Sequence, residues 1–305
     1  MQTSESAITS PTRVDPRALL QLLKPITWFP PMWAFGCGVV SSGMAPMEMP
    51  WAIVAGIILA GPMVCGASQI VNDWFDRHVD AINEPHRPIP SGRVPGRIGL
   101  YYAIAWSLLC LVLAATLGVV VFWATVLGLV LAWAYSAPPA RLKLNGWWGN
   151  AACGFCYEGL AWVIGAVVML GGAMPANEIL ILAVLYSIGA HGIMTLNDFK
   201  SIEGDLQLGV RTIPAQLGPE RAARLACVVM LVPQLVVVLL LLSWDRGSYA
   251  TAIGVGMLLQ LWAMRRLLSD PKGLAPWYNG TGVTLYVLGM LIAAFAVRGL
   301  SGVVA

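Results

Sequence analysis

Long apolar runs, separated by short polar connections, dominate the pattern of hydrophobic and polar positions along this chain. Most runs approach or reach the roughly 20 residues that a helix needs to cross the hydrocarbon core of a membrane. Glycine and proline within them do not argue against helices, because neighbouring membrane helices can satisfy the freed backbone groups. The pattern predicts about nine transmembrane helices, near residues 25–44, 51–72, 97–117, 119–136, 149–171, 178–197, 223–243, 248–268 and 277–298.

Composition supports the same class of protein. Of the 305 residues, 58% are hydrophobic and only 11% are charged, whereas soluble domains carry about 25% charged residues. We therefore predict an all-α fold, a polytopic membrane helical bundle formed by one transmembrane domain, residues 18–305. Residues 1–17 are polar and lack the apolar core of a signal peptide, so we expect a disordered cytoplasmic tail.

Lysine and arginine gather in alternate connections between the predicted helices. Because cytoplasmic loops carry an excess of these residues, the amino terminus and the connections after the second and sixth helices should be cytoplasmic. The carboxyl terminus should lie on the opposite side. The net charge of +3 mostly reflects this bias and gives no case for a nucleic-acid partner.

Three carboxylates, Asp73, Asp76 and Asp80, follow the uncharged run 51–71. At 100° per residue they fall within roughly 60° of one another on a helix. Ionisable groups at such a position are costly and usually functional, and like charges this close require a cation among them. Mg²⁺ fits, because it prefers carboxylate oxygens together with substrate phosphates.

A second acidic segment, residues 197–205, follows the apolar run 179–196 and repeats the first pattern. In both segments an Asn-Asp pair is followed seven residues later by Asp, here Asp198 and Asp205. Two facing carboxylate sets at membrane depth would clamp a metal-bound diphosphate. The alternative is ordinary charged helix ends, which the repetition of the pattern disfavours. The candidate metal ligands are Asn72, Asp73, Asp76, Asp80, Asp198 and Asp205.

Basic and hydroxyl side chains in the cytoplasmic connections are candidates for binding the diphosphate. Arginine forks match phosphate oxygens, so Arg87 and Arg93 qualify, although positive-inside charge explains them equally well. Tyr135 and Lys143 flank the Pro138-Pro139 pair and would contribute a hydroxyl and a point charge; membrane-interface anchoring is the alternative. Lys200 in the second acidic segment completes the set.

Six cysteines lie in the apolar runs. Cys153 and Cys156 have redox-motif spacing, but no thioredoxin-like context surrounds them. We interpret the cysteines as small buried hydrophobic residues.

Three segments, NDWFDRHVDAINEPHRPIPSGR, YSAPPARLKLNGWWGN and NDFKSIEGD, resemble the UbiA superfamily of intramembrane prenyltransferases, in its chlorophyll and bacteriochlorophyll synthase branch. The resemblance implies helices around a central cavity that opens laterally to lipid, with Mg²⁺ bridging both acidic motifs to a prenyl diphosphate. By position, Asn72, Asp76 and Asp80 match the first metal motif and Asp205 the second. Many members have Asp where this chain has Ser201, and Asp198 would then substitute.

The resemblance also implies a reaction. Asp76, Asp80, Asp205 and Lys143 are the expected catalytic residues, and the donor is geranylgeranyl or phytyl diphosphate. The acceptor is the propionate of bacteriochlorophyllide a, which is already ionised and needs no strong base. Mg²⁺ is the expected cofactor, and pigment–protein assembly factors are expected partners. The site would face the cytoplasm at the bacterial inner or intracytoplasmic membrane and remain in contact with membrane lipid.

Several alternatives remain open at this point. Within the enzyme class, chlorophyllide a or a quinone-type ring are rival acceptors. A cation or metabolite transporter is a different class, but transporter sites usually lie near the bilayer midplane, whereas both acidic segments follow their apolar runs. A pigment-handling protein without catalysis would not need a clamp for a metal-bound diphosphate.

Overall fold

The computed structural model describes residues 14–298 and 300, and every regular element in this part of the chain is helical. The α-helices are α1 (Pro16–Leu22), α2 (Phe29–Ser41), α3 (Pro50–Ile58), α4 (Gly66–Asn83), α5 (Ile98–Thr116), α6 (Val119–Ser136), α7 (Gly146–Gly154), α8 (Ala161–Met169), α9 (Asn177–Asn197), α10 (Ile202–Leu208), α11 (Ile213–Leu217), α12 (Pro219–Ser243), α13 (Gly247–Leu267) and α14 (Pro271–Val297). Short 3₁₀ turns are η1 (Pro25–Thr27), η2 (Pro46–Glu48), η4 (Leu142–Leu144) and η6 (Asp198–Ser201).

Seven helices within the described residues are long and apolar enough to cross a membrane. They run over Pro50–Asn83, Ile98–Thr116, Val119–Ser136, Gly146–Met169, Asn177–Leu208, Pro219–Ser243 and Pro271–Val297. The predicted runs 25–44 and 248–268 correspond to α2 and α13, which are helical but are not among the seven. α2 begins at Phe29 and has only 13 residues, and α13 carries the polar residues Gln260, Arg265 and Arg266. The count of nine crossings therefore stays a prediction.

Two π-helical stretches interrupt the long helices. η3 (Leu59–Cys65) joins α3 to α4 and contains Pro62, and η5 (Phe155–Leu160) joins α7 to α8. A proline removes one backbone donor from the helical ladder, which accounts for the altered winding around Pro62. π-helical turns inside α-helices are frequent at functional sites, and the sequence pattern gave no sign of these two.

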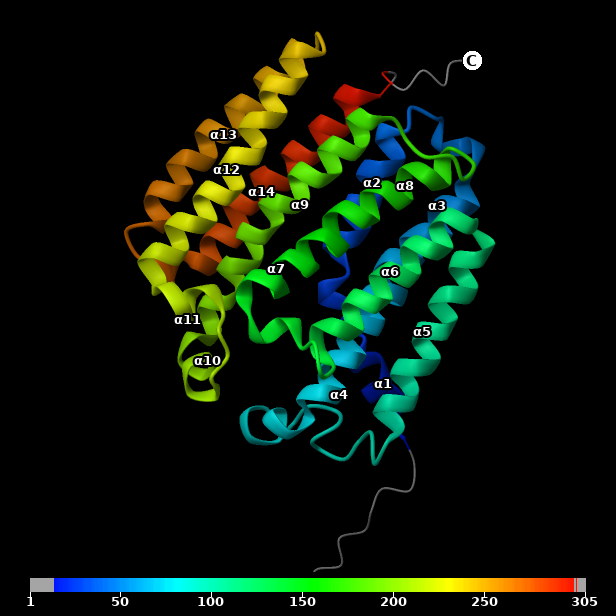
Figure 1. Cartoon of the computed structure of the whole chain (residues 1–305), viewed down its shortest axis with the longest axis vertical. Coiled ribbons are helices and arrows are strands. Elements are labelled where there is room, and N and C mark those ends of the chain that lie inside the picture. Colours follow the sequence, from blue (N-terminus) through cyan, green and yellow to red (C-terminus); the bar gives the residue numbers. More distant parts are fainter. Residues whose placement is uncertain (1–13, 299, 301–305) are drawn as a thin grey trace, which may run out of the picture.

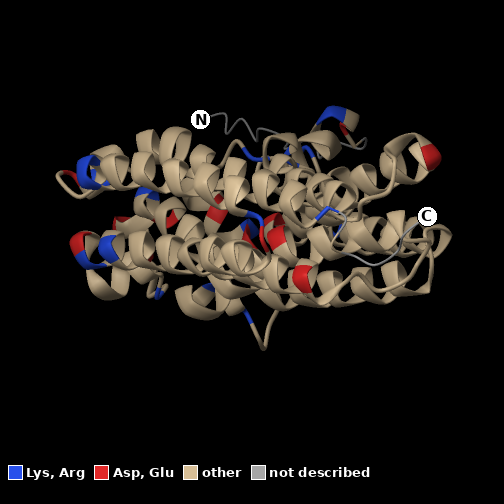
Figure 2. Cartoon of the chain, turned by 90° about the horizontal axis from the view of Figure 1, so that it is seen from above, with Lys and Arg blue, Asp and Glu red and all other residues tan. Residues whose placement is uncertain are grey.

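The helices lie side by side in one bundle, with α12, α13 and α14 on one flank and α5 and α6 on the other (Figure 1). The largest buried cluster joins α9, α12, α13 and α14 with α2 and α8, and Trp162 stacks on Tyr186 at its centre with ring centroids 5.6 Å apart. Charged positions are sparse along the ribbon (Figure 2). Large apolar side chains point outward, such as Leu258 at 66% exposure and Val112 at 65%. Such a surface suits lipid, and the protein is an integral membrane protein.

One end of the bundle gathers the polar connections. α1, the end of α4, α10 and α11 lie at this end, whereas α14 ends at the other (Figure 1). Both acidic motifs are therefore at the same end, because they occupy the last turns of α4 and the segment that follows α9. The predicted tail, residues 1–17, lies largely outside the described residues, and its last two residues, Pro16 and Arg17, begin α1.

Candidate active site

The first acidic motif lies on α4, where an apolar face holds the helix against its neighbours. Asp73 and Asp80 are almost fully buried, at 3% and 7% exposure. Asp73 accepts a hydrogen bond from Lys24 Nζ at 2.6 Å, and Arg87 Nη1 lies 3.5 Å from the same oxygen. Lys24 has the uncommon backbone φ of +44°, a conformation that needs support from surrounding structure. The cation that neutralises Asp73 is therefore a lysine from the start of the chain.

Arg87 binds the other buried carboxylate of this motif. Its Nη1 donates to Asp80 Oδ2 at 2.9 Å, and its Nε donates to Glu84 Oε2 at 2.5 Å. The hydrogen bond from Arg87 lowers the pKa of Glu84. Burial opposes the charge of Arg87, but its bonds to Glu84 and the charges of Asp80 and Asp73 outweigh burial and raise its pKa. Arg87 thus lies at the carboxylates, as the sequence predicts for a diphosphate ligand.

The third carboxylate pairs with the lysine that the sequence singles out. Lys143 Nζ donates to Asp76 Oδ1 at 2.5 Å, and Asn72 Nδ2 donates to Asp76 Oδ2 at 3.0 Å. The same amide also lies 3.3 Å from Ser136 Oγ. Burial lowers the pKa of Lys143, although the nearby Asp76 opposes this effect. The structure therefore brings Asn72 and Asp76 on α4 together with Lys143 on η4.

The second acidic motif follows α9 as the 3₁₀ turn η6 and the short helix α10. Asp205 Oδ2 accepts hydrogen bonds from Ser201 Oγ at 2.8 Å and from Thr212 Oγ1 at 2.9 Å. Asp198 Oδ2 is buried and has no hydrogen-bond partner among the described residues. Asn150 Nδ2 on α7 donates to Thr195 Oγ1 at 3.2 Å, close to the start of this motif. Asp205 is thus held by neutral hydroxyl groups, in contrast to the three aspartates of the first motif.

Two predicted diphosphate ligands have different surroundings. Arg93 Nη1 donates to Gln21 Oε1 at 2.7 Å, and its Nη2 donates to the carbonyl of His86 at 2.8 Å. These bonds attach the loop after α4 to α1, so the guanidinium is engaged away from the carboxylates. Lys200 is exposed on η6 and near enough for its charge to act on Asp198. Position alone therefore favours Lys200 over Arg93.

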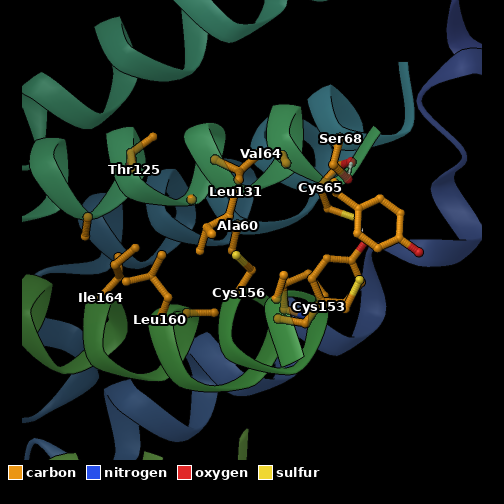
Figure 3. Close-up of a pocket in the computed structure, with 18 of the residues that line it drawn as sticks. Ala60, Val64, Cys65, Ser68, Thr125, Leu131, Cys153, Cys156, Leu160 and Ile164 are labelled. Atoms are coloured by element: carbon orange, nitrogen blue, oxygen red, sulfur yellow. Dashed lines mark hydrogen bonds between the residues drawn. The ribbon is translucent and has the colours of Figure 1, made fainter. Parts of the chain in front are cut away.

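A pocket of about 210 Å³ begins beside the first motif and continues between α3–η3–α4, α6 and α7–η5–α8. Asn72 and Tyr135 line one end together with Met194, which comes from the last turn of α9. Along α6 the lining runs from Tyr135 to Ala124, which is 11 residues or about 16 Å of helix. The interior is mostly apolar, and both π-helical stretches form part of its wall (Figure 3).

Tyr135 lines the pocket together with Asn72, on the helix that carries the first motif, and Met194, in the last turn of the helix that precedes the second. Nearby, Gln69 Nε2 donates to the Tyr157 hydroxyl at 3.3 Å, and both side chains line the pocket. The pocket therefore has one polar end, which faces both acidic motifs, and a long apolar interior.

Several residues of this site were not predicted from the sequence. They are Lys24, Ser136, Asn150, Thr212 and Asn279, whose Nδ2 donates to Asn197 Oδ1 at 2.9 Å. Asn279 lies in an apolar run, where an amide is a recognisable signal. The others lie at helix ends or in loops, where polar residues are ordinary.

Comparison with known proteins agrees with this architecture. Residues 28–285 match the UbiA prenyltransferase family. The chain is 58% identical to the bacteriochlorophyll synthase 33 kDa chain of Cereibacter sphaeroides, over 94% of each chain. It is 45% identical to the 34 kDa chain of Chloroflexus aurantiacus, covering 90% of this chain and 88% of that one. The chloroplastic chlorophyll synthase of Oryza sativa subsp. japonica is 38% identical, over 91% of this chain and 76% of that one.

The fold is also found in solved structures. A UbiA homolog from Archaeoglobus fulgidus bound to GPP and Mg²⁺ superposes with a TM-score of 0.67 at 19% identity, covering 92% of this chain and 99% of that one. A UbiA homolog from the same organism bound to DMAPP and Mg²⁺ gives a TM-score of 0.68 at 21% identity, covering 93% of this chain and 99% of that one. Family match, curated relatives and fold agree along nearly the whole chain, and the protein belongs to the UbiA prenyltransferase family.

Proposed function

We propose that this prenyltransferase esterifies the propionate of bacteriochlorophyllide a with geranylgeranyl or phytyl diphosphate, the last stage of bacteriochlorophyll biosynthesis. The names of the relatives at 58% and 45% identity support this acceptor. One structural observation carries the reaction type. An apolar pocket suited to a prenyl chain has its polar end at Asn72, which donates to Asp76, and at the last turn of α9, directly before the second motif. A transporter has no need of that combination.

The donor atoms fit Mg²⁺. Within residues 14–298, no three His, Cys, Asp or Glu side chains form a metal site by themselves. Mg²⁺ does not require such a cage, since it is usually bound by one or two carboxylates together with substrate phosphates. Asp76, Asp80 and Asp205 supply carboxylate oxygens, and Asp198 Oδ2 is a buried oxygen without a partner. When bound, Mg²⁺ would neutralise negative charge on the departing diphosphate.

The basic residues have a second role in this proposal. Lys143 and Arg87 are held by Asp76 and Asp80 through bonds of 2.5 and 2.9 Å. A diphosphate that enters offers these cations new acceptors, and each then stabilises charge that develops on the leaving group. The carboxylates released by this exchange become free to coordinate metal. The two ion pairs therefore hold the basic side chains and the carboxylates in position before the substrate binds.

The remaining residues protect the allylic centre. Tyr135 and Tyr157 line the polar end of the pocket, and aromatic faces stabilise a neighbouring carbocation. The apolar interior excludes water, which would otherwise capture that cation. The acceptor carboxylate is ionised at neutral pH, so the site needs no strong base. We further propose that this end of the bundle faces the cytoplasm of a bacterial membrane, in accord with its lysines and arginines.

The test is a product assay on purified protein. Wild-type protein with bacteriochlorophyllide a, geranylgeranyl diphosphate and Mg²⁺ should form the esterified pigment, detected by mass spectrometry. Asp76→Asn and Asp80→Asn should each lower kcat by 100-fold or more, by roughly the factor seen when one transition-state contact is lost. Glu178→Gln, at the opposite end of α9, is the matched control and should retain activity. Full activity in either aspartate variant would refute the assignment.

Chlorophyllide a is the second candidate acceptor, because relatives at 38% identity are chlorophyll synthases. Parallel assays with both pigments separate the two. Our proposal requires the larger kcat/KM with bacteriochlorophyllide a.

A further inference from the structure

Asp205 differs from the carboxylates of the first motif in the kind of side chain that bonds to it. Asp73, Asp76 and Asp80 each pair with a lysine or an arginine, at distances of 2.6, 2.5 and 2.9 Å. Asp205 instead accepts from two hydroxyls, Ser201 at 2.8 Å and Thr212 at 2.9 Å, both on its Oδ2 atom. Neutral donors orient a carboxylate without cancelling its charge, and Oδ1 takes no part in these two bonds. This arrangement suits a carboxylate that binds a cation.

The position of Thr212 is fixed by the backbone. Arg211 N donates to the carbonyl of Leu144 at 3.0 Å, and Gly146 N donates to the carbonyl of Arg211 at 2.8 Å. These bonds form an isolated parallel bridge between Asn145 and Arg211. Thr212 follows directly and is 7% exposed. The two backbone hydrogen bonds tie the segment of Thr212 to residues 144–146, and they hold the Thr212 hydroxyl next to Asp205.

The close approach of the two segments depends on Gly146. A Cβ atom on this residue would lie 2.5 Å from the backbone nitrogen of Ile213 and 3.0 Å from the carbonyl carbon of Thr212. Real Cβ atoms essentially never come within 3.0 Å of another heavy atom, so any other residue would push the segments apart. Lys143 precedes this bridge and bonds to Asp76 at 2.5 Å. The bridge thus connects the lysine of the first motif to the threonine of the second.

We propose that Ser201 and Thr212 are positioning residues that orient Asp205 toward a divalent cation, and that the bridge at Asn145–Arg211 sets the spacing between the two motifs. This inference rests on the proposed function. It also assigns a role to Ser201 in the second motif. The serine supplies a hydrogen bond to Asp205, and Asp198 supplies a second carboxyl group in this motif.

The experiment measures metal affinity directly. Mn²⁺ is titrated into full-length protein in detergent, and the free ion is quantified by electron paramagnetic resonance. Outer-shell partners of metal ligands typically contribute 10–100-fold to affinity, so Thr212→Val and Ser201→Ala should each weaken Mn²⁺ binding about 10-fold. Thr212→Ser keeps the hydroxyl and should restore wild-type affinity. Gly146→Ala should weaken binding as well, whereas Gly256→Ala, which meets no atom within 4 Å, should not.

The outcomes are distinguishable. Weakened binding in Thr212→Val with recovery in Thr212→Ser supports the inference, since a fold defect would not be rescued by one hydroxyl. Unchanged Mn²⁺ affinity in both Thr212→Val and Ser201→Ala, with wild-type protein binding the ion, overturns the inference and leaves the proposed function intact. Absence of Mn²⁺ binding in wild-type protein would count against the metal-dependent function itself.

Discussion

Gly128 provides a direct way to test whether the pocket holds the prenyl chain. It lies on α6 seven residues from Tyr135, which places it about 10 Å deeper in the pocket than the polar end. A Cβ atom there would meet Leu160 Cδ2 at 3.3 Å and Val64 Cγ1 at 3.8 Å, both across the pocket. Gly128→Leu therefore adds its side chain to the interior and closes the far part of the pocket.

The expected loss of binding free energy follows from the number of donor carbons that the leucine displaces. A leucine side chain contributes four carbons, so it excludes about four carbons of a long donor from the pocket. At about 0.8 kcal/mol per buried CH₂, the loss is about 3 kcal/mol, which is on the order of a 100-fold decrease in kcat/KM. Only donors long enough to pass Gly128 should be affected. A ten-carbon donor should react as well as before.

The assay compares geranyl, farnesyl and geranylgeranyl diphosphate with wild-type protein and the Gly128→Leu variant. Our account requires that, in Gly128→Leu, the kcat/KM for geranylgeranyl diphosphate divided by that for geranyl diphosphate falls by about 100-fold. Gly256→Leu makes the same change on α13, where no atom lies within 4 Å, and should leave the ratio unchanged. An equal loss for all three donors in Gly128→Leu would show that the prenyl chain lies elsewhere.

Two further predictions concern basic residues. Burial lowers the pKa of Lys143, so its ammonium loses a proton at a lower pH than an ordinary lysine, and activity should fall as the pH rises through that value. Lys143→Arg keeps the charge and should shift this fall to higher pH; an unchanged profile of kcat/KM against pH would refute the role. Arg93 bonds to Gln21 and the His86 carbonyl, so Arg93→Gln should leave KM for the donor unchanged. Arg87→Gln should raise that KM, and equal effects in both variants would contradict the distinction.

Much of the fold follows from hydropathy alone, because a membrane admits few arrangements of the backbone. The apolar runs became helices, and Gly118, with φ of +115°, separates α5 from α6 where the sequence offers no other turn signal. The count of crossings was less secure, since α2 is short and α13 carries polar residues. The sequence pattern did not reveal the π-helical stretches, because one extra residue in a helical turn leaves the apolar run unchanged.

The candidate site was predicted in part. Asn72 and Asp76, which the sequence singled out, share one face of α4 and lie together, and Lys143 bonds directly to Asp76. The partner of Asp73 was not predictable, since Lys24 is 49 residues away and approaches through the packing of the chain start against α4. The same holds for Thr212, whose approach to Asp205 depends on a backbone bridge between distant loops.

The central claim is that both acidic motifs bind one metal–diphosphate group. An experimental structure of the protein with Mn²⁺ and a non-reactive geranylgeranyl thiodiphosphate tests it most directly, because anomalous scattering locates the ion. Our account predicts manganese bound by Asp76 or Asp80 and by Asp205, with one diphosphate between the motifs. A diphosphate bound to one motif alone, with no metal at the other, would contradict the account.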